Sequence, residues 1–217
     1  MSAPVFSYEK DPDAIYRQSF EIVRAETDLS RFDPEETDVA VRLVHACGMP
    51  EIAADLIFGK GAVAAGRAAL AAGAPVICDA AMVAHGITPR LLPKQNEVVC
   101  LIRDPHVRAL AKEEATTLSA AQVELWREKL GGAVVAVGNA PTALFRLMEL
   151  ILEGGPRPAV ILGFPVGFVG AAESKAALAE TNGLPPYLTL QGRRGGSAMA
   201  SAAVNALAIL AGKDMAT

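Results

Sequence analysis

Five short apolar runs constrain the fold of this chain more than any other feature. Each is four or five residues long and rich in Val, Ile or Leu; they are residues 75–79, 98–102, 133–137, 159–162 and 187–190. Runs of this length that do not alternate with polar residues are typical of strands buried on both faces of a parallel sheet. Helical patterns separate them. The sequence therefore predicts an α/β fold with an open, mainly parallel five-stranded sheet and helices on both faces.

Composition agrees with this class of fold. Hydrophobic residues make up 52% of the 217 residues and aromatic residues only 5%, so Ala, Val, Leu and Ile must form the core. No break in composition divides the chain, which predicts one domain over residues 1–217. The net charge of −4 gives no overall basic field, so we expect no nucleic-acid partner.

The cysteines and the apolar segments indicate the compartment. Cys47, Cys78 and Cys100 lie in apolar contexts without a Cys-x-x-Cys pair, so neither a disulfide framework nor a zinc site is indicated. The N-terminus has no apolar leader, and no apolar run is long enough to span a membrane. We expect a cytoplasmic protein that does not associate with membranes.

The first predicted helix carries a hydroxyl on its apolar stripe. It begins at Asp11 and Pro12, a capping oxygen followed by a proline at the first helical position. Ser19 shares one face with Ile15 and Val23. Such a hydroxyl either bonds a backbone carbonyl of its own helix or serves a function, and both interpretations remain open.

His45 lies in the last turn of the second predicted helix, which begins at Asp33 and ends at Gly48. The negative end of the helix dipole favours the imidazolium, whereas Arg42, three residues earlier on an adjoining face, opposes it. Histidine is the side chain best suited to proton transfer near neutral pH, so His45 is a candidate acid-base catalyst. The alternative is that His45 only caps helix carbonyls. The sequence of residues 50–58 predicts a further short helical segment. A later helix is predicted to start at Ser119.

Glycine-rich loops follow the predicted strands at the edge where parallel sheets bind ligands. They comprise residues 138–142, 163–170 and 191–197, and the last contains Arg193 and Arg194. Glycine lets backbone N–H groups at helix N-termini approach anionic oxygens closely. The loops therefore predict an anionic ligand, although glycines that merely permit tight turns are the alternative.

Several common sites lack their sequence signatures. The chain has neither the dinucleotide-binding nor the P-loop glycine motif, and no histidines or carboxylates at metal-binding spacing. No nucleophile elbow supports a hydrolase triad. We therefore expect no metal and no bound cofactor.

Several segments together resemble the precorrin-8X methylmutase family, isomerases of cobalamin biosynthesis. The matching segments are residues 41–48, 79–86, 138–142, 163–169 with 173–175, and 192–197, in the family's order. The resemblance implies a flavodoxin-like fold and a homodimer. It also implies a methyl migration from C-11 to C-12 of a corrin precursor, precorrin-8X, giving hydrogenobyrinic acid or, in the cobalt-inserted branch, cobyrinic acid.

The resemblance also implies roles for particular residues. His45 matches the family's catalytic histidine, a proton donor or acceptor, and Ser19 and Arg42 match substrate contacts. Because the substrate carries many carboxylates, Arg17, Arg193 and Arg194 are further predicted contacts. A migration within one molecule needs no methyl donor, redox cofactor or metal. Two alternatives remain: a non-catalytic corrinoid carrier and a nucleotide-binding α/β enzyme.

Overall fold

The chain forms an α/β fold around one six-stranded sheet. A computed structural model describes residues 6–214. The strand order is β1-β6-β5-β4-β2-β3. The strands are β1 (Leu56–Phe58), β2 (Val76–Cys78), β3 (Val98–Val99), β4 (Val134–Val137), β5 (Val160–Gly163) and β6 (Tyr187–Leu190).

The five predicted strands are present and parallel to one another. Their order, β3-β2-β4-β5-β6, is that of flavodoxin-like sheets, in which the chain reverses its direction of winding between the first and third parallel strands. This switch point lies between β2 and β4. The predicted mainly parallel, flavodoxin-like architecture is confirmed.

The predicted strand count of five is wrong. The additional strand, β1, lies at the sheet edge and pairs antiparallel with β6, with Leu56 opposite Leu190. The predicted helical segment over residues 50–58 is helical only as the 3-10 helix η1 (Pro50–Asp55). Three apolar residues directly after a helical turn carry no periodicity of their own, and their pairing partner is remote in sequence.

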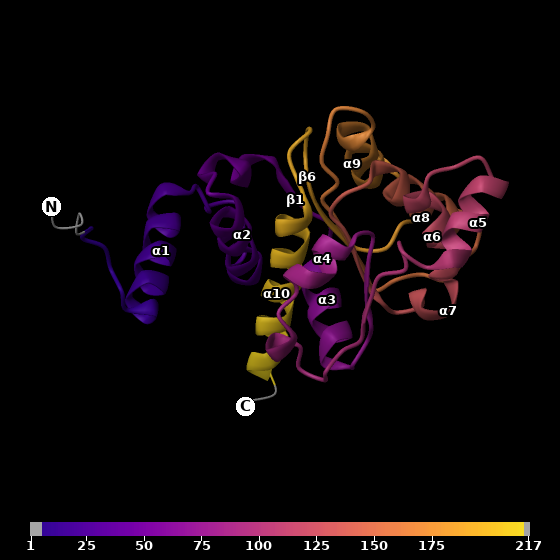
Figure 1. The fold of residues 1–217 in the computed structure, drawn as a ribbon. Coiled ribbons are helices and arrows are strands. Elements are labelled where there is room, and N and C mark those ends of the chain that lie inside the picture. The colour runs from indigo at the N-terminus through magenta and orange to yellow at the C-terminus, as the bar shows by residue number, and fades with distance from the viewer. Residues whose placement is uncertain (1–5, 215–217) are drawn as a thin grey trace, which may run out of the picture.

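Helices cover both faces of the sheet (Figure 1). One side carries α1 (Pro12–Glu26), α2 (Pro34–Cys47), α3 (Ala62–Ala71), α4 (Ala81–Gly86), η2 (Pro89–Leu91) and α10 (Ser197–Asp214). The other carries α5 (Pro105–Glu113), α6 (Leu118–Leu125), α7 (Arg127–Leu130), α8 (Pro141–Leu152) and α9 (Ala171–Glu180). Within residues 6–214, no helix is both long and apolar enough to cross a membrane.

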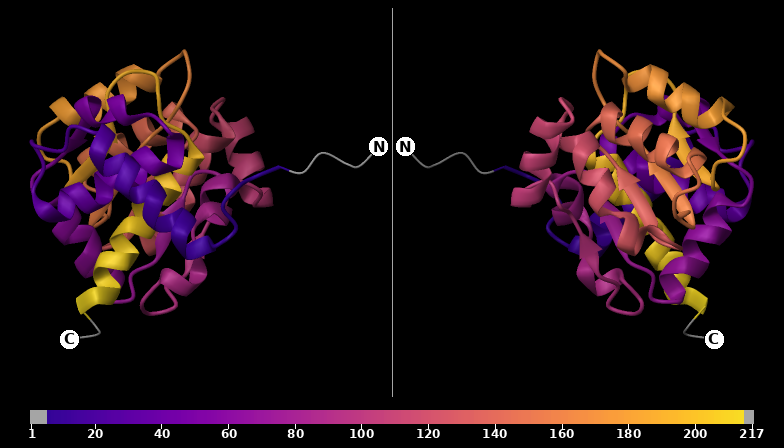
Figure 2. Two further views of the ribbon diagram at one scale, coloured as in Figure 1. Left: turned by 90° about the vertical axis from the view of Figure 1, so that its left-hand side faces the viewer. Right: turned by 90° about the vertical axis from the view of Figure 1, so that its right-hand side faces the viewer.

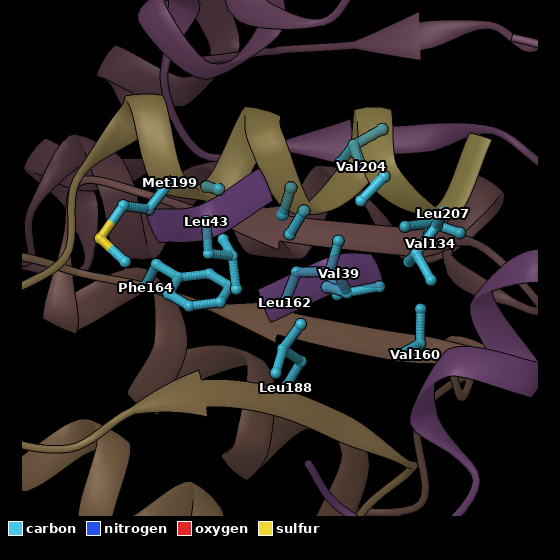
Figure 3. Close-up of a cluster of buried hydrophobic side chains, with 14 of the residues drawn as sticks. Val39, Leu43, Val134, Val160, Leu162, Phe164, Leu188, Met199, Val204 and Leu207 are labelled. Atoms are coloured by element: carbon cyan, nitrogen blue, oxygen red, sulfur yellow. The ribbon is translucent and has the colours of Figure 1, made fainter. Parts of the chain in front are cut away.

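Helix α10 lies at the centre of the larger core. Figure 3 shows Val204 and Leu207 of α10 facing Val39 of α2 and side chains from the strands, among them Val134 and Leu162. These side chains are buried. Apolar side chains that interdigitate in this way fix the position of α2 against the sheet.

Helix α1 is packed differently from the others. It lies outside α2, farthest from the sheet (Figures 1 and 2), and none of its residues is buried. Ile15, Tyr16 and Ile22 are each nearly half exposed. The apolar stripe predicted for α1 is therefore only partly covered in the single chain.

Helix starts agree with the sequence at two of three positions. Asp11 caps α1, and Asp33 forms a capping box with Glu36 at the start of α2. The cap of α6 is Thr117 and not Ser119, because the Thr117 hydroxyl accepts from Ala120 N and Ser119 already lies in the first turn.

Candidate functional site

The His45 side chain is exposed at the end of α2 and is held from the side by α1. Its Nδ1 lies 3.0 Å from the Ser19 hydroxyl, and the ring of Phe20 stacks on it with the centroids 4.8 Å apart. No side-chain hydrogen bond within residues 6–214 joins His45 or Ser19 to a carbonyl of its own helix. Both structural alternatives, a carbonyl cap for His45 and an intrahelical bond for Ser19, thus fail.

The Ser19 hydroxyl suits a ring that changes its protonation state. A hydroxyl can donate to an unprotonated Nδ1 or accept from a protonated one, so the contact persists in either state. Nε2 has no hydrogen-bond partner in the described part of the chain. The ring is thus held at one nitrogen by Ser19, and its other nitrogen has no partner in the described residues.

Phe20 and Tyr16 also position Arg42. The Arg42 guanidinium donates to the Tyr16 hydroxyl at 3.0 Å and lies 5.2 Å from the centroid of the Phe20 ring. Phe20 thus contacts both His45 and Arg42. The sequence patterns did not single out these two aromatic residues, although they form a pair four residues apart on a helix that also carries Ser19.

Two pockets adjoin these residues. The first, which we call the cation pocket, has a volume of about 390 Å³. It is lined by Tyr16, Arg17, Phe20, Glu21, Arg24, Asp38, Arg42, Ala206, Ile209, Leu210 and Lys213. The second, the histidine pocket, has a volume of about 220 Å³ and contains Ser19 and His45 together with Gly48 and Pro50.

The cation pocket carries uncompensated positive charge. Asp38 is already paired with Arg24 at 2.8 Å and with Lys213 at 3.2 Å. Neither Arg17 nor Arg42 has an ion-pair partner among residues 6–214. Both guanidinium groups therefore remain able to bind carboxylates.

The loops after β5 and β6, residues 164–170 and 191–196, form one unit that we call the paired loops. Gly167 N donates to Arg193 O at 3.3 Å, and Gly196 N donates to Phe164 O at 2.8 Å. The buried Lys175 of α9 donates through Nζ to Arg194 O. These bonds hold the two loops side by side at the carboxyl edge of the sheet.

Arg194 connects the paired loops to the segment that follows His45. Its guanidinium pairs with Glu51 at 3.0 Å and with Asp55 at 2.7 Å, both in η1. Gln191 N also donates to Asp55 O at 2.9 Å. Because η1 follows directly on the end of α2, His45 lies at the same edge of the sheet as the paired loops.

The predicted site residues therefore fall into two groups. Ser19, Arg42 and His45 come together between α1 and α2, and Arg17 joins Arg42 in the cation pocket. Arg193 and Arg194 lie on the paired loops, where Arg193 is exposed and Arg194 is paired with two carboxylates.

Gly195 allows the close approach of the paired loops. A Cβ at this position would lie 2.5 Å from Phe164 O and 2.6 Å from Pro165 O. Gly195→Ala is expected to lower the free energy of unfolding by about 1–3 kcal/mol, because backbone must move to relieve the overlap. Urea denaturation measures this loss.

Gly212→Ala in α10 is the matched control, because no heavy atom lies within 4 Å of the Cβ that it adds. Its expected effect is a stabilisation of at most about 1 kcal/mol, from helix propensity. Equal effects of the two variants would contradict the steric explanation.

Lys175 gives the protein a pH-dependent stability. Burial lowers the pKa of Lys175 to about 8. Between about pH 8 and about pH 10.5 the unfolded chain binds more protons at this residue than the native chain does, so this residue makes stability rise with pH. Lys175→Met lacks this contribution.

Urea midpoints of wild type and Lys175→Met at about pH 7 and about pH 10 test this expectation. The stability of wild type relative to the variant is expected to increase at the higher pH. A constant difference would show that Lys175 keeps an ordinary pKa in the folded chain, and a decrease would show that its pKa is raised there.

The switch point between β2 and β4 is filled by a side chain of the protein itself. The buried carboxylate of Asp79 accepts hydrogen bonds from Gly138 N at 2.8 Å, Asn139 N at 2.9 Å and Ala140 N at 2.8 Å. Burial raises the pKa of the Asp79 carboxyl, and the N–H donors act in the opposite direction. These N–H groups are thus occupied, which argues against the nucleotide-binding alternative at this loop.

The other two histidines have local roles. His85 Nδ1 lies 2.6 Å from Ala81 O, one helical turn earlier, which agrees with a capping role. His106 is 83% exposed and contacts the Asp104 carboxylate at 2.8 Å. Neither adjoins the cation pocket or the histidine pocket.

Known proteins with similar sequence and structure identify the family. A family model described as precorrin-8X methylmutase matches residues 14–210. A precorrin-8X methylmutase of Sinorhizobium sp is 58% identical over 94% of this chain and 98% of its own length. A cobalt-precorrin-8 methylmutase of Priestia megaterium is 36% identical over 92% of this chain and 88% of its own length. The crystal structure of a precorrin-8X methylmutase from Thermus thermophilus matches with a TM-score of 0.85 and 43% identity, covering 93% of this chain and 97% of that one. The chain belongs to the precorrin-8X methylmutase family.

Proposed function

We propose that this chain catalyses the intramolecular migration of a methyl group from C-11 to C-12 of precorrin-8X, giving hydrogenobyrinic acid. One observation carries the proposal: in a chain of this family, Ser19 holds His45 at Nδ1, and Phe20, which stacks on the His45 ring, also lines the cation pocket with its unpaired arginines. The reaction is an isomerisation, so substrate and product have the same composition and any proton delivered during the shift is balanced by one removed.

His45 is the proposed proton donor and acceptor. Protonation of a macrocycle nitrogen by Nε2 redistributes the electrons of the ring system and favours the methyl shift. Such general acid-base catalysis contributes about 10²–10⁴-fold to a rate. Ser19 keeps the imidazole oriented, and a fixed substrate position contributes further acceleration.

The arginines are the proposed contacts for the substrate carboxylates. Arg17 and Arg42 have no ion-pair partner in the described residues, and Arg193 is exposed on the paired loops. Arg194 is a weaker candidate as a direct contact, because a substrate carboxylate would compete with Glu51 and Asp55. We assign it chiefly to fixing the paired loops beside η1.

We also propose that the functional unit is a cytoplasmic homodimer of single-domain chains. The half-exposed apolar residues of α1 support a second copy as the covering surface, because an isolated chain would leave them in water. Sedimentation equilibrium tests this assembly, and a monomer at micromolar concentration would contradict it.

The metal-free substrate is proposed in preference to the cobalt form. The Sinorhizobium relative named for the metal-free substrate is 58% identical, whereas the Priestia relative named for the cobalt substrate is 36% identical. Assays with precorrin-8X and cobalt-precorrin-8 in parallel test this preference, and faster turnover of the cobalt form would reverse it.

The activity assay also separates the remaining alternatives. Purified protein is mixed with precorrin-8X, the absorption spectrum is followed over time, and the product is identified by NMR at unchanged mass. A methylmutase converts the substrate catalytically. A carrier would bind it without a time-dependent spectral change, and a nucleotide-binding enzyme would bind ATP or NADPH but no tetrapyrrole.

A further inference from the structure

The paired loops display apolar side chains to solvent. Phe168 is 83% exposed and Val169 is 89% exposed, whereas Phe164 in the same loop is buried. Exposed aromatic side chains in a folded chain mark binding surfaces when they cluster with groups of matching chemistry. The surroundings of Phe168 therefore determine what this surface can bind.

The exposure of Phe168 does not come from a loose loop. The loop is joined to its neighbour by the Gly167 N to Arg193 O bond and the Gly196 N to Phe164 O bond. Lys175 fixes the neighbouring loop, because its Nζ donates a hydrogen bond to Arg194 O. Phe168 thus directly follows a residue, Gly167, whose backbone is hydrogen-bonded to the neighbouring loop.

Arg193 accompanies Phe168 on this surface. Its guanidinium carbon lies 5.5 Å from the centroid of the Phe168 ring, within the range of a cation–π contact. No carboxylate pairs with Arg193 in the described residues. The pair therefore offers an aromatic face and a guanidinium side by side.

The pair is connected to the site at His45. Arg194, the residue after Arg193, is bound to Glu51 and Asp55 of η1, which follows directly on α2. Arg194 also acts on the Cys47 thiol, whose pKa is raised above all by burial and lowered in part by this guanidinium. The paired loops and the end of α2 thus lie at one edge of the molecule.

We propose that Phe168 and Arg193 form a substrate-contact pair for the tetrapyrrole, with Phe168 against the apolar surface of the macrocycle and Arg193 on a peripheral carboxylate. This proposal rests on the proposed function. A macrocycle that is apolar in its body and anionic at its periphery matches both members of the pair. Lys175 acts as a positioning residue, since its Nζ fixes the carbonyl next to Arg193.

Binding of hydrogenobyrinic acid, followed by its absorption spectrum, tests the pair. Phe168→Ala and Arg193→Ala are each expected to weaken binding about tenfold. The double variant is expected to lose less than the product of the two single effects, because the residues contact each other and the same ligand. Leu152→Ala and Arg108→Ala, which truncate exposed residues elsewhere, serve as controls with unchanged binding.

A derivative with its peripheral carboxylates converted to amides separates the two contributions. The effect of Arg193→Ala is expected to shrink with this ligand, while that of Phe168→Ala remains. Equal thermal midpoints show that the variants stay folded, as the exposure of both side chains leads us to expect.

The outcomes distinguish this inference from the proposed function. If wild type turns over precorrin-8X and both pair variants bind product as tightly as the controls do, the contact pair is wrong and the methylmutase function stands. If wild type neither binds hydrogenobyrinic acid nor converts precorrin-8X, the proposed function itself is wrong.

Discussion

His45→Ala is expected to abolish detectable methyl migration, with kcat reduced by at least about 10²-fold, the usual contribution of a positioned acid-base group. Binding of hydrogenobyrinic acid is expected to change much less, because the proposed carboxylate contacts, Arg17 and Arg42, remain in place. Single-turnover conversion of precorrin-8X and equilibrium binding of product, measured on the same preparation, give the two quantities separately.

His106→Ala is the matched control, because it removes an exposed imidazole whose polar contact among residues 6–214 is with Asp104. Its turnover is expected to equal that of wild type. The turnover of Ser19→Ala is expected to lie between those of His106→Ala and His45→Ala, since this variant keeps the imidazole but loses the hydrogen bond that holds Nδ1. Undiminished turnover by His45→Ala would rule out the proton-transfer role.

Asp79→Ala is expected to lower the free energy of unfolding by about 3 kcal/mol or more, because each buried N–H left without an acceptor costs about 1–3 kcal/mol. Three N–H groups lose their acceptor in this variant: those of Gly138 and Ala140, whose hydrogen bonds are buried, and that of Asn139, whose hydrogen bond is partly buried. The variant also avoids the cost of burying a carboxylate, which offsets part of this loss of stability. Urea denaturation at neutral pH measures the difference.

Thr117→Ala provides the comparison for Asp79→Ala. It removes a side-chain acceptor from one N–H at the start of α6, that of Ala120. The expected cost is about 1 kcal/mol, since water can replace the hydroxyl at an exposed helix start. A loss for Asp79→Ala no larger than that for Thr117→Ala would mean that water satisfies the N–H groups at the switch point.

The sequence predicted the features that local patterns determine. Uninterrupted apolar runs identified the parallel strands, and Asp11 and Asp33 identified two helix starts. Strand β1 escaped detection because three residues have no usable periodicity, and β6, which stabilises it, lies near the other end of the chain.

In the candidate site, too, local sequence patterns predicted single residues but not the contacts between them. Sequence patterns singled out Ser19 and His45 separately, but their contact depends on how α1 packs on α2. Arg193 and Arg194 look equivalent in the sequence, yet carboxylates from η1 neutralise only Arg194. The hydrogen bonds between Asp79 and the 138–142 loop could not be predicted either. They join two segments that are far apart in the sequence, and neither segment has a pattern that indicates the contact.

The carboxylate at the switch point has a consequence for ligand discrimination. Sheets with this strand order commonly accept phosphate groups at this crevice, where N–H groups at a helix start point outwards. Here a phosphate would have to displace the Asp79 side chain, which already accepts hydrogen bonds from three N–H groups. A side chain of the protein itself therefore competes with a nucleotide phosphate for the N–H groups that phosphates use in related architectures.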